Sequence, residues 1–285
     1  MNRSILFIVN PISGRKGSKK RIVRELLKSG HSVAFTEYAG HAEFLARDAA
    51  EEVVVAVGGD GTVNEVARGL LGTDKILGII PCGSGDGLAL CLGISRTFRK
   101  AFRTVMEGEA VALDCAEICG RPFFSVCGTG LDAIVSDKFS HSSRRGLLTY
   151  IKYAFETWKG FVPETCTISV DDSERTLETV LVTVGNSNQW GNNARITPGA
   201  ECGDGLLDVT IVRNFKNIEI PVLAWRLMTG SIDRSRRVVT MRGRRIRICR
   251  TSEGPAHYDG DCFHAGKELS IGLLPRKLRV LKPRD

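Results

Sequence analysis

Apolar residues in the first hundred positions follow two alternating spacings. Short, largely apolar runs are typical of strands buried on both faces, and they occur at 5–9, 33–36, 53–57 and 76–80. Between them, apolar residues recur every three or four positions, as in amphipathic helices, at 18–29, 41–50 and 62–71. Strands that alternate with helices in this way predict an α/β fold with a parallel, doubly wound sheet covered on both faces.

The start of the third expected helix carries a local signal of its own. Thr62 and Glu65 have the Thr-x-x-Glu spacing of a capping box, in which both side chains accept hydrogen bonds from the backbone of the first turn. We therefore expect this helix to begin at Thr62.

After residue 110 the pattern changes to short segments in which apolar and polar residues alternate. Three clear examples lie at 166–170, 177–184 and 206–212, separated by turn-forming residues. This combination predicts a mainly antiparallel β domain. Two helical stretches, 147–159 and 218–228, interrupt the strands.

The change of pattern predicts two domains. The first covers 1–113, and a last strand within 276–285 could return to it. The second, β-rich domain covers 114–275. A cleft between two domains is the usual place for a ligand, so we expect the site there.

Composition narrows the class of protein. A hydrophobic content of 42% and a charged content of 25% are typical of a folded globular protein. No apolar run reaches the roughly 18 residues of a membrane span, and the run before Asn10-Pro11 is too short for a signal peptide. Nine cysteines without a Cys-x-x-Cys pair indicate free thiols in a reducing compartment. These features predict a cytoplasmic protein.

The net charge of +8 comes from one part of the chain. Residues 231–285 hold 14 basic and 6 acidic side chains, and eight arginines fall within 234–250. The alternation Arg245-Ile246-Arg247-Ile248 predicts a strand whose arginines point outward. Such a face is either simply solvated or binds an anionic partner, namely a membrane surface or nucleic acid. Few aromatic residues interleave with these arginines, which argues against nucleic acid.

The strongest chemical signal is Gly58-Gly59-Asp60-Gly61-Thr62, between the third strand and the third helix. Glycines at the carboxyl end of a parallel strand let backbone N–H groups approach a phosphate, and a helix N-terminus favours anions. A carboxylate beside a phosphate needs a cation between them, so Asp60 indicates Mg²⁺. The alternative is a glycine-rich turn whose aspartate only caps the helix. Two further polar loops, 10–14 and 81–87, follow other strands, and no Walker A pattern is present.

These motifs together resemble the diacylglycerol and sphingosine lipid kinases, whose nucleotide domain is related to that of NAD kinases. The resemblance covers nearly the whole chain. It rests on six motifs in order, at 10–14, 58–65, 81–84, 128–133, 204–208 and 259–261.

The resemblance implies roles for individual residues. Contacts to ATP would come from Asn10, Thr36, Gly58, Gly59, Asp60, Gly61, Thr62, Asn64, Glu65 and Ser84. A second, structural Mg²⁺ would be held by the Asp204 carboxylate and the carbonyl groups of Glu201 and Leu206.

The resemblance also implies which residues act on the lipid hydroxyl that receives the phosphate. Asp261 stands where the family has a catalytic glutamate, and with Asp259 it would form a catalytic pair of carboxylates on one side of an extended segment. Asp132 would hold the headgroup of the lipid.

The sequence therefore predicts an ATP- and Mg²⁺-dependent kinase that phosphorylates a diacylglycerol or a sphingoid base. It would be cytoplasmic, associate peripherally with an anionic membrane through 234–250 and bind no nucleic acid. An oligomer is compatible with the sequence, which does not specify the oligomeric state. Two alternatives stay open: a kinase of a soluble substrate, as NAD kinase is, and a catalytically silent protein that binds lipid or nucleic acid. A dinucleotide fingerprint at 128–133 and a metal-like cluster at 257–264 are the less favoured interpretations of those segments.

Overall fold

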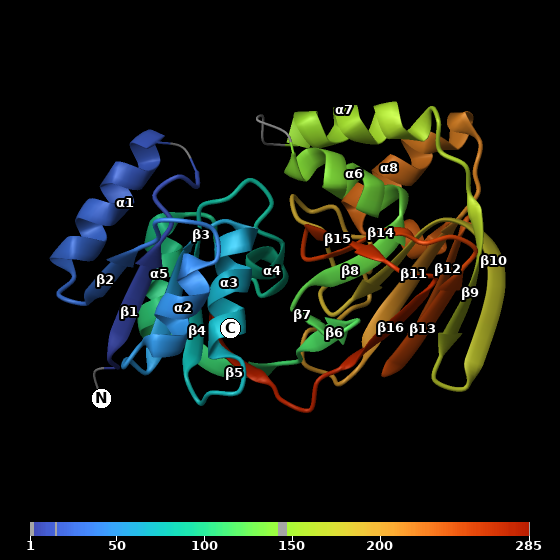
Figure 1. The fold of residues 1–285 in the computed structure, drawn as a ribbon. Coiled ribbons are helices and arrows are strands. Elements are labelled where there is room, and N and C mark those ends of the chain that lie inside the picture. The colour runs from blue at the N-terminus through green and yellow to red at the C-terminus, as the bar shows by residue number, and fades with distance from the viewer. Residues whose placement is uncertain (1–2, 15, 142–146, 285) are drawn as a thin grey trace. The chain divides into compact units, whose positions relative to one another are not determined.

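The computed structural model describes residues 3–14, 16–141 and 147–284 (Figure 1). The chain divides into two compact units. The first consists of Met1–Asp114 together with Pro275–Asp285, and the second of Cys115–Leu274.

The described part of the first unit contains a six-stranded sheet in the order β2-β1-β3-β4-β17-β5. Its strands are β1 (Ile5–Val9), β2 (Ser32–Phe35), β3 (Val53–Gly58), β4 (Ile76–Pro81), β5 (Glu109–Leu113) and β17 (Leu278–Lys282). The first four are parallel, and β17 adds parallel to β4 and antiparallel to β5. Every residue of β1, β3 and β4 is buried, as their apolar sequences require.

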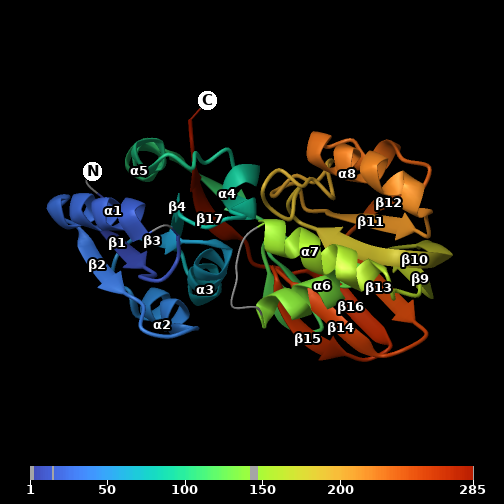
Figure 2. The ribbon, with the colours of Figure 1, turned by 90° about the horizontal axis from the view of Figure 1, so that it is seen from above.

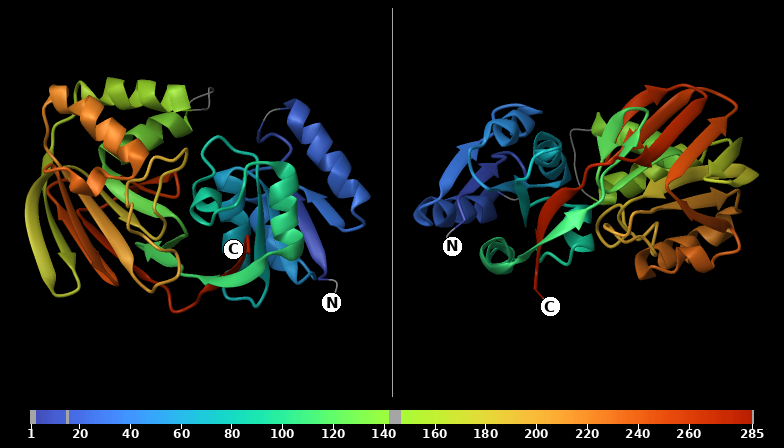
Figure 3. Two further views of the ribbon diagram at one scale, coloured as in Figure 1. Left: turned by 180° about the vertical axis from the view of Figure 1, so that it is seen from behind. Right: turned by 90° about the horizontal axis from the view of Figure 1, so that it is seen from below.

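Helices cover both faces of this sheet. They are α1 (Lys16–Lys28), α2 (His41–Asp48), α3 (Asp60–Leu70), α4 (Gly87–Cys91) and α5 (Phe98–Glu107). The pair α2 and α3 lies on one face, and α1 and α5 lie on the other (Figures 2 and 3). The predicted α/β class with a doubly wound, mostly parallel sheet is confirmed.

The expected capping box is wrong. Helix α3 begins at Asp60, and Gly59 occupies the N-cap position without a side-chain hydrogen bond. The Glu65 carboxylate instead accepts the backbone N–H of Ala42 at the start of the neighbouring helix α2, 3.1 Å away. Thr62 and Glu65 have the spacing of a capping box, but α2 packs closely on α3. Glu65 therefore accepts a backbone N–H from the first turn of α2 instead of one from its own helix.

The second unit is built on an antiparallel sheet of eleven strands within the described residues, which confirms the predicted class of this half. Its strands are β6 (Ala116–Ile118), β7 (Arg121–Phe123), β8 (Val126–Gly130), β9 (Glu164–Val170), β10 (Ser173–Gly185), β11 (Leu207–Arg213), β12 (Val238–Gly243), β13 (Arg245–Arg250), β14 (Gly254–Tyr258), β15 (Asp261–Ala265) and β16 (Glu268–Leu273). The long β10 pairs with β9 along its first half and with β8 and β11 along its second. It therefore joins the parts of the sheet.

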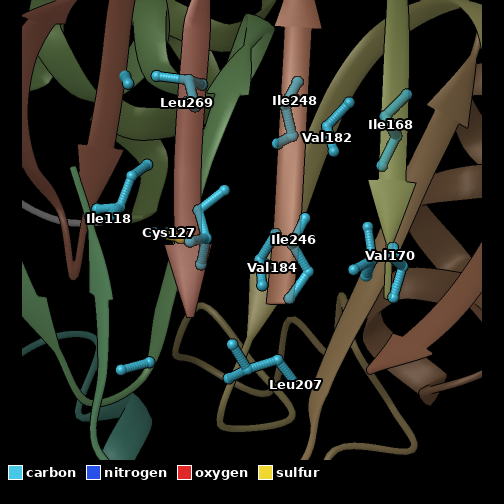
Figure 4. Close-up of a cluster of buried hydrophobic side chains, with 14 of the residues drawn as sticks. Ile118, Cys127, Ile168, Val170, Val182, Val184, Leu207, Ile246, Ile248 and Leu269 are labelled. Carbon is cyan, nitrogen blue, oxygen red and sulfur yellow. The ribbon is translucent and has the colours of Figure 1, made fainter. Parts of the chain in front are cut away.

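The helices of the second unit are α6 (Leu131–Ser140), α7 (Leu147–Trp158) and α8 (Ile220–Thr229), with 3₁₀ turns η1 (Asn217–Glu219) and η2 (Ile232–Arg234). Apolar side chains of the strands form the core, among them Ile168, Val182, Ile246 and Ile248 (Figure 4). All four have lost almost all contact with water, because alternate residues of each strand point to the same face.

Arg250 occupies an inward position of β13 and is buried. Its guanidinium donates to the Thr129 hydroxyl and to four backbone carbonyl groups, those of Gly254, Pro255, Ala265 and Gly266, at 2.6–3.1 Å. A single side chain thus holds the ends of β8, β14 and β15 together. Burial lowers the pKa of this guanidinium, and the five acceptors offset the cost of its lost hydration.

We predict that Arg250→Met lowers the free energy of unfolding by about 3 kcal/mol or more, because five buried acceptors lose their donor. Urea denaturation measures this loss. The matched control is Arg245→Met, which changes an exposed arginine of the same strand and should cost no more than about 0.5 kcal/mol. Equal losses in the two variants would contradict the role of Arg250.

Candidate functional site

Three polar loops meet at the carboxyl edge of the parallel sheet. They follow β1, β3 and β4, and the strand order reverses between β1 and β3, where ligands bind in open α/β sheets. The Asn10 N–H donates to Val57 O at 3.1 Å, and the Cys82 N–H donates to Gly58 O at 2.7 Å. The structure therefore brings together the loops that contain Asn10, Gly58–Thr62 and Ser84.

Asn10 ties the first loop to helix α3. Its amide nitrogen donates to the Thr62 hydroxyl at 3.1 Å, and its side-chain oxygen accepts the Ile12 N–H at 3.0 Å. Lys19, which sequence reasoning did not select, donates to the Asn10 carbonyl and to the Ser13 hydroxyl of the same loop. Burial lowers the pKa of this lysine. The Lys19 side chain therefore anchors the loop through these two hydrogen bonds.

Asp60 fastens the third loop to the second. Its two carboxylate oxygens accept the backbone N–H groups of Asp86, at 2.9 Å, and Gly87, at 2.7 Å. The backbones of Gly59 and Gly83 also approach closely, since a Cβ atom on Gly83 would lie 2.7 Å from the Gly59 Cα. Glycine is therefore required at position 83 by packing as well as by any ligand.

Asp86 adds a second carboxylate to this edge. It has a left-handed backbone (φ 51°), accepts the Gly83 N–H at 2.9 Å and pairs with the Arg96 guanidinium at 3.1 Å. Burial, followed by the charge of Asp60, raises the pKa of Asp86 to about 6, while Arg96 acts in the opposite direction. Burial also raises the pKa of Asp60. The two carboxylates thus concentrate negative charge at one place.

The donor set around Asp60 fits a hard divalent cation, because it offers carboxylate oxygens that carry excess negative charge. Each oxygen of Asp60 keeps a lone pair beyond the one used by the backbone N–H group. Gly61 and Ser84, which belong to the two loops joined by Asp60, are exposed. The edge can therefore take a phosphate and its cation.

The remaining residues predicted to contact ATP are placed less directly. Thr36 is buried after β2, where its N–H donates to Val9 O at 3.0 Å, and Asn64 is buried within α3. Glu65 is engaged with the start of α2, as described above. Contacts of these three side chains with ATP stay predictions.

In the second unit, Asp132 is the centre of a buried polar cluster. Its carboxylate accepts the Thr183 hydroxyl at 3.0 Å and the Ala133 N–H at 2.8 Å, and lies 3.1 Å from the His257 Nε2. Gly128 lies between these side chains, and a Cβ atom there would be 2.9 Å from the Asp132 Oδ2. Sequence reasoning named His257 only as a member of a metal-like cluster. Its pairing with Asp132 depends on the register of β8 and β14, which no local pattern reveals.

The expected extended arrangement of Asp259 and Asp261 is wrong. Asp259 and Gly260 both have positive φ, 49° and 90°, and form the tight turn between β14 and β15. The Asp259 carboxylate accepts the backbone N–H groups of Phe124, Ser125 and Val126 at 2.8–3.0 Å. Asp261 is exposed at the first position of β15. Asp259 therefore anchors the turn that presents Asp261.

The turn predicted to hold a structural Mg²⁺ contains a guanidinium instead. Arg242 pairs with the Asp204 carboxylate and, at 3.1 Å, with that of Asp208. The Glu201 carbonyl accepts the Gly203 N–H at 2.8 Å. Arg242 therefore supplies positive charge to both carboxylates in this structure. Ligation of Mg²⁺ by Glu201, Asp204 and Leu206 stays a prediction.

Over residues 3–14, 16–141 and 147–284, no group of three or more acidic, histidine or cysteine side chains is arranged to hold a metal ion.

The arginines of 234–250 are only partly available to an external partner. Arg237 pairs with Glu219 at 2.8 Å, Arg247 with Glu268 at 2.7 Å, and Arg242 with the two aspartates described above. Arg250 is internal. Half of the eight arginines therefore have their charge satisfied within the second unit.

The raised pKa of Asp86 predicts a pH dependence of stability. Its ordinary value is 3.8 and its value in the folded protein is about 6, so between these pH values the folded state binds more protons than the unfolded state. The free energy of unfolding therefore falls as the pH rises through this window, by up to about 3 kcal/mol. In Asp86→Asn this contribution is absent.

Urea denaturation of both proteins in magnesium-free buffer, from about pH 4 to about pH 7, measures the difference directly. We expect the stability of Asp86→Asn relative to wild type to increase with pH across the window. Two curves that stay parallel would show that Asp86 does not titrate there.

Comparison with known proteins identifies the family of both units. Residues 4–118 match the family described as diacylglycerol kinase catalytic domain, and residues 125–282 match the YegS C-terminal NAD kinase beta sandwich-like domain. The chain is 29% identical to a diacylglycerol kinase of Bacillus subtilis over 98% of this chain and 96% of that protein. It is 26% identical to a diacylglycerol kinase of Mycobacterium tuberculosis, covering 97% and 94%.

Solved structures share the fold. A diacylglycerol kinase structure from Bacillus anthracis superposes with a TM-score of 0.77 at 21% identity, covering 99% of this chain and 97% of that one. An NAD kinase from Archaeoglobus fulgidus in complex with ATP superposes with a TM-score of 0.57 at 12% identity, covering 98% and 94%. Together with the two family matches, these likenesses confirm the predicted resemblance, and the chain belongs to the diacylglycerol kinase and YegS family of lipid kinases.

Proposed function

We propose that this protein transfers the γ-phosphoryl group of ATP to the hydroxyl group of a diacylglycerol, in a reaction that requires Mg²⁺. The observation that carries the proposal is the meeting of three polar loops at the sheet edge, where Asp60 joins the second loop to the third and Asn10 joins the first to helix α3, in a chain whose relatives are named diacylglycerol kinases. A sphingoid base is the competing acceptor, and it is tested in the same experiment.

The first unit would bind the nucleotide. Phosphoryl transfer depends mainly on positioning and on neutralising the charge that develops on phosphate oxygens. The glycines after β3 let the backbone approach the phosphates, and the N-terminus of α3 adds favourable partial charge. Asp60 would hold Mg²⁺, which when bound neutralises phosphate charge. The Asp86 and Gly87 N–H groups keep the Asp60 carboxylate in one orientation.

The second unit would supply the groups that act on the acceptor. Asp261 would accept the proton of the attacking hydroxyl group, because it is an exposed carboxylate on a turn that Asp259 holds rigid. Asp132 is buried against His257 and Thr183, so we assign to it the shaping of the headgroup site.

We further propose that the protein is cytoplasmic and associates peripherally with the membrane. Across the described residues, no helix combines the length and the apolar character that a membrane crossing requires. Anionic lipid would attract the exposed arginines of 234–250.

A transfer assay with labelled ATP tests the proposal. We expect phosphate on diacylglycerol in the presence of Mg²⁺ and none after chelation, and we expect Asp60→Asn to lower kcat by on the order of a hundredfold or more. The matched control is Asp74→Asn, an exposed aspartate of the same unit, which should keep full activity.

Sphinganine and NAD are offered in parallel. Label on sphinganine alone would move the acceptor to sphingoid bases, and label on NAD alone would refute a lipid acceptor. Full activity of a folded Asp60→Asn protein would refute the role of Asp60.

Asp261→Asn tests the proton acceptor. An amide cannot take up the proton, so kcat should fall by about 10²- to 10⁴-fold while the KM for ATP stays unchanged. Asp261→Glu should keep a measurable part of the activity. Asp172→Asn, an exposed carboxylate in the turn between β9 and β10, is the control. Unchanged turnover in Asp261→Asn would show that another group accepts the proton.

A further inference from the structure

The outward face of helix α8 is apolar. Ile218, in the preceding 3₁₀ turn, and Val222, Trp225 and Met228 are 82%, 54%, 64% and 47% exposed, and their spacing places them along one stripe. Leu223 packs inward against the core of the second unit. A surface helix normally presents polar side chains to water. This helix presents apolar side chains on both faces.

Helix α7 extends the same apolar surface. Ile151 and Phe155 are more than half exposed, as is Val162 after the helix ends. Trp158 at the end of α7 stacks on Phe215, with ring centroids 4.4 Å apart, and donates to the Asn217 side chain at 2.8 Å. These contacts join the end of α7 to the turn that precedes α8, and both helices lie on the same side of the unit (Figures 1 and 3).

Basic side chains accompany these apolar ones. The segments 147–162 and 215–230 contain four basic residues, Lys152, Lys159, Lys216 and Arg226, and two acidic residues. Both acidic residues are in ion pairs, Glu156 with Lys152 and Glu219 with Arg237. The surface formed by α7, η1 and α8 is therefore apolar with a positive excess.

We propose that this α7–α8 surface docks the protein on an anionic lipid bilayer. Apolar side chains enter the boundary between headgroups and acyl chains, tryptophan is favoured at that depth, and basic residues attract anionic headgroups. The inference rests on the proposed lipid acceptor, since an enzyme must reach the membrane to phosphorylate a molecule dissolved in it.

Charge favours the bilayer over a second copy of the chain. A symmetric dimer through this surface would place two surfaces of the same positive excess against each other, which is repulsive. The surface also differs from the arginine segment 234–250, where half of the arginines are already paired or buried within the protein.

Sedimentation with vesicles of phosphatidylcholine and phosphatidylglycerol tests the proposal. The test variant is Val222→Ser with Trp225→Ser, and the matched control is Leu27→Ser with Phe44→Ser, which removes two comparably exposed apolar residues from helices of the first unit. We expect the test variant to bind at least about tenfold more weakly than wild type and the control to bind like wild type.

Two further measurements separate this inference from the proposed function. Wild type and test variant should phosphorylate a short-chain diacylglycerol dispersed in detergent at equal rates. No phosphorylation by either protein would refute the proposed function. Vesicle binding is measured without turnover, so its result does not depend on that outcome. Light scattering gives the oligomeric state. Vesicle binding that is absent in wild type, or equal in wild type and test variant, overturns the docking surface. A dimer that is lost only in the test variant also overturns it, in favour of a second copy.

Discussion

The polar edge of the sheet in the first unit depends on one carboxylate. Asp60 is the first residue of α3, yet its two oxygens accept N–H groups from the loop after β4, more than twenty residues later in the chain. Hydrogen bonds from two backbone donors offset part of the desolvation cost that burial imposes on the charged form. Asp60 therefore fixes the distance between the two loops. A cation bound there would find a carboxylate that is already oriented.

The same physical device recurs in the second unit. Asp259 satisfies three consecutive N–H groups at the start of β8, and Arg250 satisfies four carbonyl groups at the adjacent ends of β14 and β15. Short antiparallel strands leave many backbone groups without a ladder partner where each strand ends. A single charged side chain can satisfy several of them at once, since ionised groups make strong hydrogen bonds. The turn that carries Asp261 is rigid for this reason.

Sequence periodicity was sufficient for the class of both units, because buried strands and amphipathic helices differ in the spacing of apolar residues. Periodicity did not predict contacts between a side chain and a residue outside its own helix or strand. Glu65 contacts a neighbouring helix, and Asp132 pairs with a histidine 125 positions away. Arg250 was within reach of sequence reasoning, since the alternation that places Ile246 and Ile248 inward also places residue 250 inward.

Net charge and membrane affinity are connected less simply than the composition suggests. The formal charge of the arginine segment equals the whole excess charge of the chain, but ion pairs with Glu219, Asp208 and Glu268 neutralise three of its members and burial removes a fourth. At physiological ionic strength, salt screens the attraction between the remaining arginines and anionic headgroups with a screening length of about 8 Å. Apolar contact does not suffer this screening. Insertion of apolar side chains fixes the depth and direction of a helix in the bilayer, whereas charge alone fixes neither. The exposed apolar side chains of α7 and α8, with their modest positive excess, can therefore orient the second unit on a bilayer more firmly than a larger charge spread over a sheet.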